Sequence, residues 1–233
     1  DKYMPKIKNN IDRVSKRIDQ SATECGRAPS EILLLAVSKT RSTDEIRRAM
    51  DAGLTHFAEN YLQEALDKIS QLEDEDLHWH FIGPLQSNKT RSVAEHFNWV
   101  HSVDRLKIAQ RLNDQRPEEL GQLNICLQVN IDHEPSKSGL LADAVLTVAL
   151  EVVKLPNLRL RGLMAIPQAE PSFQQQQIAF QKLAELREHI NQSLDNSEKL
   201  DTLSMGMSND LEAAVSQGST IVRVGTDIFG KRE

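Results

Sequence analysis

The sequence has few cysteines, no long apolar run and no excess of basic residues, and each absence excludes a class of protein. The two cysteines, Cys25 and Cys126, lie far apart and lack the spacing of metal ligands, so neither a disulfide framework nor a metal site is expected. No apolar run approaches the roughly 18 to 20 residues that cross a bilayer. The opening segment, DKYMPKIKNN, lacks the apolar core of a signal peptide. We therefore expect a cytoplasmic protein without a membrane partner.

The charge of the chain argues against nucleic acid as its partner. A formal net charge of -6 does not provide the dominant basic surface that binding to a phosphate backbone requires, although a local basic pocket is still allowed. The 233 residues, 39% of them hydrophobic, are enough for one large core. Since no linker or low-complexity boundary appears, we expect residues 1–233 to form a single domain, with two small domains as the alternative.

Eight short aliphatic or β-branched runs alternate with stretches of helical periodicity, which is the pattern of repeated βα units around a parallel sheet. With one more amphipathic helix in front, at 7–25, this pattern predicts an α/β fold, a (β/α)8 TIM barrel with an extra N-terminal helix. A doubly wound open sheet is the alternative that periodicity leaves open. The eight runs are 32–39, 55–60, 78–85, 99–104, 123–131, 158–166, 202–208 and 220–228.

Local signals mark the starts of several helices. Ser42 followed by Glu45 predicts a capping box, in which each residue satisfies a backbone amide of the other. Asp104 is expected to cap the helix that follows it, and Asn209 with Glu212 resembles a second capping box. Two further helices are expected over 140–155 and 171–194.

Polar residues at the carboxyl ends of the strands are the candidates for function, because a TIM barrel builds its active face there. Lys39, at the end of the first run, has two interpretations. It is a lysine that extends to solvent, which position alone favours, or a partly desolvated amine for Schiff-base chemistry with a carbonyl. The remaining strand-end candidates are Asn60, Gly83, Gln86, Asn130, Asp132, Met164, 204–208, Arg223, Gly225 and Thr226.

The last two strand ends together predict a phosphate site. The segment SMGMS, 204–208, offers backbone amides around Gly206 and a hydroxyl at Ser208, followed by a helix start. The segment VRVGT adds the guanidinium of Arg223, a close backbone approach at Gly225 and the hydroxyl of Thr226. Each fragment alone is common, but barrel phosphate sites are often built from the loops after strands seven and eight.

Lys39 gains meaning from this phosphate site, because the first and eighth strands of a closed barrel are neighbours. A Schiff-base lysine beside a phosphate site suits pyridoxal phosphate (PLP) or a phosphorylated sugar aldehyde.

Other candidates are weaker. His78 and His80 are expected to be exposed and packed, respectively, rather than metal ligands; the segment 83–91 is an anion contact or a plain helix start; and the loop 134–139 reads first as mobile, with closure over a ligand as the alternative.

The sequence also resembles a known family over nearly its whole length. The segments that carry the resemblance are LLAVSKT, AENYLQEALDK, HWHFIGPLQSNK, HSVDR, SKSG, LRGLMAIP, GMSNDLEAA and STIVRVGTDIFG. They resemble those of the PLP homeostasis proteins, the YggS/PROSC-like family. The resemblance implies a barrel like the N-terminal domain of alanine racemase, with PLP held as a Schiff base on Lys39. The same carry-over gives the PLP-binding residues as Lys39, Asn60, Met164, Ser204, Gly206, Met207, Ser208, Arg223, Gly225 and Thr226.

The resemblance leaves open whether the protein is an enzyme or a carrier. A PLP racemase uses two bases, and in the alanine racemase arrangement the second base comes from a separate C-terminal domain, whereas the sequence given ends at Glu233. We therefore expect a cofactor that is open to water, without settled catalysis: a monomeric carrier that buffers PLP or delivers it to PLP-dependent apoenzymes. The alternatives are a racemase or another Schiff-base enzyme of low activity and a regulatory module whose partner reads cofactor occupancy.

Overall fold

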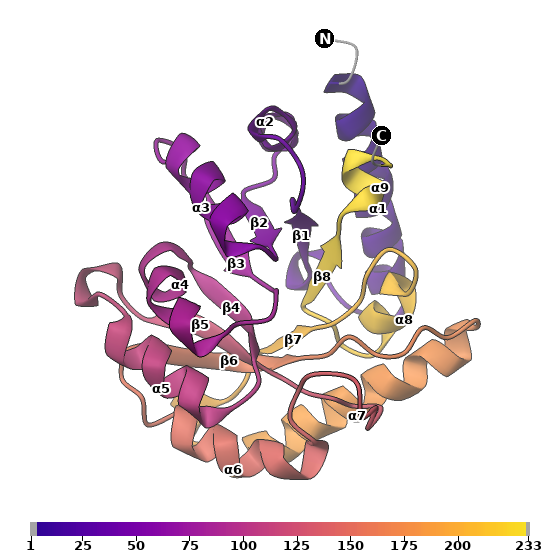
Figure 1. The fold of residues 1–233 in the computed structure, drawn as a ribbon. Helices are drawn as coiled ribbons and strands as arrows, with labels where there is room; N and C mark the ends of the chain where they lie inside the picture. Colours follow the sequence, from indigo (N-terminus) through magenta and orange to yellow (C-terminus); the bar gives the residue numbers. More distant parts are fainter. Residues whose placement is uncertain (1–3, 232–233) are drawn as a thin grey trace.

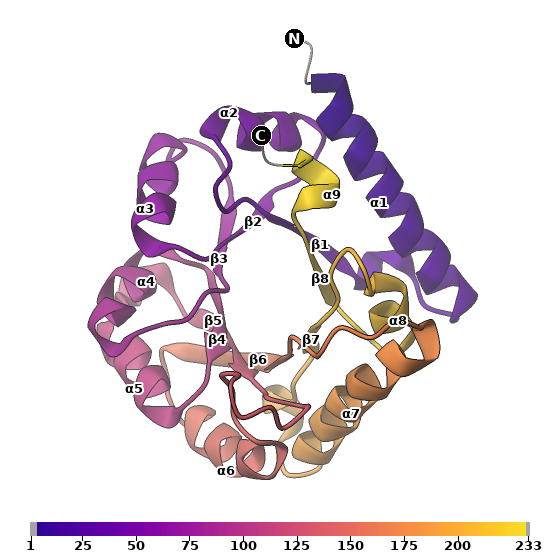
Figure 2. The ribbon, with the colours of Figure 1, turned by 45° about the vertical axis from the view of Figure 1, so that its right-hand side comes forward.

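The computed structural model describes residues 4–231, and these residues form a closed barrel of eight parallel strands (Figures 1 and 2). The strands follow one another around the barrel in chain order, and β1 pairs with both β2 and β8. Closure confirms the predicted barrel and excludes the open sheet. The strands are β1 (Leu33–Val37), β2 (His56–Glu59), β3 (His78–Phe81), β4 (Trp99–Val103), β5 (Leu123–Gln128), β6 (Leu158–Met164), β7 (Thr202–Ser204) and β8 (Ile221–Val224).

The helices surround the strands, and α1 lies along α8 and α9 on the outside of the β8 side of the barrel (Figure 2). The helices are α1 (Met4–Glu24), α2 (Thr43–Asp51), α3 (Leu62–Gln71), α4 (Thr90–His96), α5 (Leu106–Gln115), α6 (Ala142–Val152), α7 (Phe173–Asn191), α8 (Leu211–Ser216) and α9 (Thr226–Phe229). Short 3₁₀ turns lie at Pro29–Glu31, Ser87–Lys89, Glu118–Leu120 and Asn196–Glu198. None of the helices within residues 4–231 combines the length and the apolarity needed to cross a membrane.

The apolar side chains form two layers, as alternation along a barrel strand requires. In β1, Ala36 and Leu34 pack outward against the layer between strands and helices, whereas Leu35 packs inside the barrel. The inner cluster is small, and its buried members are Leu35, Ala58, Trp99, Cys126, Met164 and Ile221. Because both faces of each strand are buried, the strand sequences read as nearly continuous apolar runs.

The helix starts show where local signals succeed. The Ser42 hydroxyl accepts the Glu45 amide at 3.1 Å and the Glu45 carboxylate accepts the Ser42 amide at 3.1 Å, so the predicted capping box is confirmed. The expected cap at Asp104 is wrong. Helix α5 begins at Leu106, and its N-cap, Arg105, makes no capping hydrogen bond through its side chain. The Asp104 carboxylate instead accepts a hydrogen bond from the Arg105 guanidinium at 2.9 Å.

The expected capping box at Asn209 and Glu212 is also wrong. Helix α8 begins at Leu211 with Asp210 as its N-cap, and the Glu212 carboxylate is held by Arg17 of α1 at 2.7 Å. A contact between α1 and α8 therefore takes the carboxylate that a capping box would use.

The strand expected over 202–208 ends at Ser204, because Gly206 has a φ of 102° and turns the chain out of the sheet.

Candidate functional site at the carboxyl ends of the strands

Lys39 lies just beyond β1, at the carboxyl end of the barrel, and is half-buried. Within residues 4–231, its ammonium group has no hydrogen bond or ion pair. The next residue, Thr40, has a φ of 64°, which is rare for a residue other than glycine, and its hydroxyl donates to the Lys39 carbonyl at 2.6 Å. The backbone around Lys39 is therefore held in a defined turn, whereas its amine is not held by any described residue.

A buried ion-pair cluster supports this turn from below. The Lys68 ammonium donates to the Ser38 carbonyl at 2.7 Å, to the Glu59 carboxylate at 3.0 Å and to the Glu64 carboxylate at 2.7 Å. The Ser38 hydroxyl also donates to Glu59, and the Thr40 amide donates to Glu64. Burial raises the pKa of Glu59, whereas the Ser38 hydroxyl and the Lys68 charge oppose that rise. The cluster thus fixes both residues that flank Lys39.

Sequence reasoning missed this cluster. The spacing of Glu64 and Lys68 by four residues on a helix was an available signal for part of it. The burial of Lys68 and Glu59 could not be predicted from the sequence, because it depends on how α3 packs over the ends of β1 and β2.

Asn60 opens into a cavity of about 280 Å³ at the carboxyl ends of β2 to β6. Its side-chain oxygen is buried and, among the described residues, has no hydrogen-bond partner. Gly83 lies against the Asn60 backbone, since a Cβ at position 83 would lie 2.2 Å from the Asn60 carbonyl oxygen. A buried unpaired acceptor is costly unless a ligand or water satisfies it. The Asn60 oxygen is therefore a candidate acceptor for a hydrogen bond from a ligand or a water.

The predicted mobile loop, 134–139, borders the same cavity through Lys137 and Ser138. Asn130 ties the loop to the end of β5, because its amide donates to the Glu134 carbonyl at 2.7 Å and its side-chain oxygen accepts the Glu134 amide at 3.1 Å. Closure of the loop over a ligand stays a prediction.

The loop after β7 turns tightly at Gly206, where the backbone packs closely against α8. Gly206 is buried with a φ of 102°, and a Cβ there would lie 2.6 Å from the Ala214 Cβ. Ser208 is half-buried in the same loop. The Asp210 carboxylate accepts the Met207 amide at 2.7 Å, and burial raises the pKa of Asp210. Asp210 was not among the predicted site residues, although it orders the loop that was expected to hold an anion.

Arg17 of α1 joins the loops after β7 and β8. Its guanidinium donates to the Ser208 carbonyl at 2.7 Å and to Glu212 at 2.7 Å, and it pairs with Asp227 at 3.3 Å. Helix α1 thereby braces both loops of the predicted phosphate site. The sequence of α1 gave no sign of these contacts, because the partners lie 191 to 210 residues away along the chain.

The eighth strand end lies beside the first, as predicted. Gly225 packs against Val37, since a Cβ at position 225 would lie 3.4 Å from the Val37 carbonyl oxygen. Thr226 is exposed and begins the short helix α9. The structure thus brings Gly225, Thr226 and the Lys39 turn to one region of the barrel rim.

Arg223, Ser204 and Met164 lie deeper, inside the barrel. The Arg223 guanidinium donates to the Ser204 hydroxyl at 2.7 Å and to the Ala165 carbonyl at 3.1 Å. Burial lowers the pKa of Arg223 to about 10. Met164 is buried in the inner apolar cluster. The predicted site residues therefore lie at two depths. Backbone and hydroxyl groups lie at the barrel rim, and the Arg223 guanidinium lies beneath them in the barrel interior.

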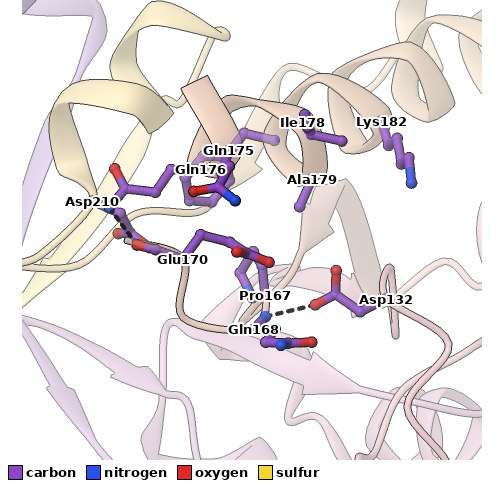
Figure 3. Close-up of a pocket in the computed structure, with 11 residues that line it drawn as sticks. Asp132, Pro167, Gln168, Glu170, Gln175, Gln176, Ile178, Ala179, Lys182 and Asp210 are labelled. Carbon is purple, nitrogen blue, oxygen red and sulfur yellow. Dashed lines mark hydrogen bonds between the residues drawn. The ribbon is translucent and has the colours of Figure 1, made fainter. Parts of the chain in front are cut away.

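A second pocket of about 250 Å³ lies between α7 and the loops after β5, β6 and β7 (Figure 3). Asp132, predicted as a strand-end candidate, points into it and accepts the Gln168 amide at 2.6 Å. Asp210 contributes to the opposite wall. Through Asp210 this pocket adjoins the loop after β7, and Lys39 does not line it.

The two histidines of the HWH segment behave as predicted. His78 is exposed and stacks on His56, with ring centroids 4.3 Å apart, whereas His80 is buried and stacks on Trp99 at 5.3 Å. Within residues 4–231, no group of three or more His, Cys, Asp or Glu side chains is arranged to hold a metal ion.

Comparison with known proteins identifies the family. Residues 5–233 match the family described as alanine racemase, N-terminal domain. The chain is 56% identical over 230 residues to the pyridoxal phosphate homeostasis protein of Pseudomonas aeruginosa, covering 99% of this chain and 97% of that protein. It is 50% identical over 240 residues to the protein of the same name from Escherichia coli K12, covering 99% and 98%.

Solved structures agree with this assignment. The structure of PipY from Synechococcus elongatus with PLP bound has a TM-score of 0.81 at 36% identity, covering 93% of this chain and 100% of that one. An alanine racemase from Clostridium difficile has a TM-score of 0.70 at 14% identity, which shows a shared fold, and this chain covers 56% of it. The chain therefore belongs to the alanine racemase N-terminal domain family, together with the proteins named pyridoxal phosphate homeostasis protein.

Proposed function

We propose that the protein binds PLP at the carboxyl ends of its strands, as a Schiff base on Lys39, and takes part in PLP homeostasis. The observation that carries the proposal is the half-buried Lys39, whose amine has no hydrogen bond or ion pair among the described residues, at the carboxyl ends of the strands, where the unpaired Asn60 oxygen and the Gly206 turn also lie. The PLP bound to the related PipY supports the same cofactor. When bound, PLP supplies an aldehyde for a lysine amine and a ring that accepts electrons.

Each predicted residue then has a task that its position allows. Gly206, Ser208, Gly225 and Thr226 at the rim would hold the phosphate, with Met207 in the same loop, because backbone amides and hydroxyls suit a phosphate oxygen. Asn60 and Met164 would line the ring. Arg223 supplies positive charge from the barrel interior, and Ser204 holds its guanidinium.

The proposed role is that of a carrier without efficient turnover, a cytoplasmic monomer that buffers PLP or hands it to apoenzymes. The chain covers 97% and 98% of the two homeostasis proteins but 56% of the Clostridium racemase, so the racemase chain extends far beyond the matched part. The proposal predicts that the PLP-loaded protein leaves single enantiomers of amino acids unchanged. Racemisation at enzyme-like rates, of about 1 per second or more, would contradict it.

The Schiff base has a direct test. Purified protein loaded with PLP is reduced with borohydride and mapped by peptide mass, and we expect the pyridoxyl group on Lys39. The Lys39→Ala variant should lose the visible absorbance of bound PLP. Lys154→Ala is a matched control, because Lys154 is an exposed lysine on the outer side of the barrel wall, paired with Glu151. A pyridoxyl group on another lysine, or none, would overturn the assignment.

A further inference from the structure

Three histidines that the proposed site does not use form a continuous row inside the barrel. His56 Nδ1 lies 2.9 Å from His80 Nε2, and His80 Nδ1 lies 2.9 Å from His101 Nε2. His101 Nδ1 lies 2.7 Å from the Ser204 hydroxyl, which also receives the Arg223 guanidinium at 2.7 Å. The row passes through β2, β3 and β4 and then crosses the barrel interior to β7 and β8.

The row also rises along the barrel. His56 is the first residue of β2 and half-buried, whereas Ser204 is the last residue of β7 and fully buried. It therefore connects the amino-terminal end of the barrel with the floor of the mouth at the carboxyl end. Its hydrogen-bonded neighbours lie up to 103 residues apart along the chain, so only the closed barrel brings them together.

The position of every proton in the row follows from Arg223. A guanidinium only donates hydrogen bonds, so the Ser204 oxygen accepts from Arg223. His101 Nδ1 is the other partner of this buried hydroxyl among the described residues, so the Ser204 hydrogen finds an acceptor only if it is directed to His101 Nδ1. The His101 proton is then on Nε2 and is donated to His80 Nδ1, and the same step repeats from His80 to His56. All three rings are neutral Nε2–H tautomers, with their lone pairs directed toward the cation.

The histidine row explains how the Arg223 cation is stabilised in the barrel interior without a carboxylate partner. Arg223 is a buried cation, and within residues 4–231 no carboxylate lies within ion-pairing distance of it; its two acceptors are the neutral Ser204 hydroxyl and Ala165 carbonyl. Removing a charge from water costs free energy unless polar groups stabilise it. A chain of aligned hydrogen bonds can do so while the guanidinium keeps its charge. We infer that His56, His80 and His101 form a directed, uncharged acceptor row that, through Ser204, positions Arg223 and preserves its charge for the ligand at the mouth.

The surroundings keep the row neutral. Burial lowers the pKa of His101 to about 3, with the Arg223 charge acting in the same direction, and it lowers the pKa of His56 to about 4. A second proton on His56 or His80 would also place two N–H donors against each other, and one on His101 would face the hydrogen of the Ser204 hydroxyl. The other titratable or charged groups around the row are His78 on the His56 ring, Cys126 of β5, Arg161 over the Trp99 ring, Asp201 and Asp210.

The first test needs no cofactor. Long-range proton–nitrogen correlation spectra of the apoprotein with ¹⁵N-labelled histidine should show His56, His80 and His101 as neutral Nε2–H tautomers at neutral pH. The His78→Gln variant is the control, because it removes a ring outside the row and should leave the three tautomers unchanged. A charged ring or an Nδ1–H tautomer at any of the three positions would overturn the inference.

The second test rests on the proposed function and uses a matched pair at His101. In His101→Asn, the amide oxygen can replace Nδ1 as the acceptor for Ser204, whereas His101→Leu removes the acceptor. We expect PLP to bind about tenfold more weakly to the Leu variant, the size of effect when a buried polar group loses its partner, and nearly normally to the Asn variant. Equal affinities of the two variants would contradict the inference.

A double-mutant cycle distinguishes an effect through Arg223 from a general structural effect of the His101 substitution, because only the former depends on the residue at position 223. If His101 acts through Arg223, then His101→Leu should weaken PLP binding much less in an Arg223→Gln background than in the wild type. Additive effects would refute the coupling. Failure of the wild-type protein to bind PLP would instead refute the proposed function, and the tautomers of the apoprotein would still decide whether the row exists.

Discussion

Mild acid should destabilise this protein through the buried histidine row. Burial lowers the pKa of His101 to about 3 in the folded protein, whereas an unperturbed histidine has a pKa of about 6.5. Between these values, the unfolded chain binds more protons than the folded one, so the free energy of unfolding decreases as the pH falls through this window. At about pH 5 the loss from His101 alone is about 2 kcal/mol. His80, whose pKa burial also lowers, adds to that loss.

The assay is urea unfolding followed by circular dichroism at about pH 5 and about pH 7.5, below and above the ordinary histidine pKa. His101→Asn cannot take up the proton, so its free energy of unfolding should decrease between the two pH values by about 2 kcal/mol less than that of the wild type. His189→Asn is the control, because it removes an exposed ring on α7, outside the barrel interior, and should keep the wild-type pH dependence. Identical pH dependence in wild type and His101→Asn would refute the reasoning.

Two further substitutions test the turn and the ion-pair cluster that shape the site. Gly206→Ala should lower the free energy of unfolding by about 2 kcal/mol or more and weaken PLP retention, because its φ is 102° and the new Cβ meets the Ala214 Cβ at 2.6 Å. Gly26→Ala is its control, with a φ of 75° and nothing within 4 Å, so a similar cost there would contradict the role of the close contact. Lys68→Met should cost about 3 to 5 kcal/mol in urea unfolding, because it leaves the buried Glu59 carboxylate unpaired. Adding Glu59→Gln should restore part of that stability, and no recovery would show that the ion pair is not the cause.

The fold was largely predictable because its signals are local. Each strand is a short apolar run, and helices such as α2 are bounded by a capping box that involves only Ser42 and Glu45. The two capping predictions that were wrong, at Asp104 and Asn209, show the limit of such signals. In α5 the carboxylate bonds to its neighbour, and at α8 the Glu212 carboxylate bonds to an arginine on α1.

The candidate site was predictable only in part. Placing Lys39, Gly225 and Thr226 at neighbouring strand ends required nothing beyond a closed barrel. The partners that hold these segments were not predictable, because Lys68 reaches Ser38 and Arg17 reaches Ser208 only through the packing of helices over the strands.

The sequence by itself determined the order of the strands, the barrel class and the position of Lys39 at a strand end, since periodicity, capping and strand length are properties of neighbouring residues. The tertiary structure decided the direction and the partners of the interior polar groups. Arg223 appeared in the sequence as one more cation near a phosphate loop, but in the folded chain it lies beneath the mouth, held by Ser204. His101 and Ser204 meet only because closure of the barrel brings β4 and β7 to face each other across its interior.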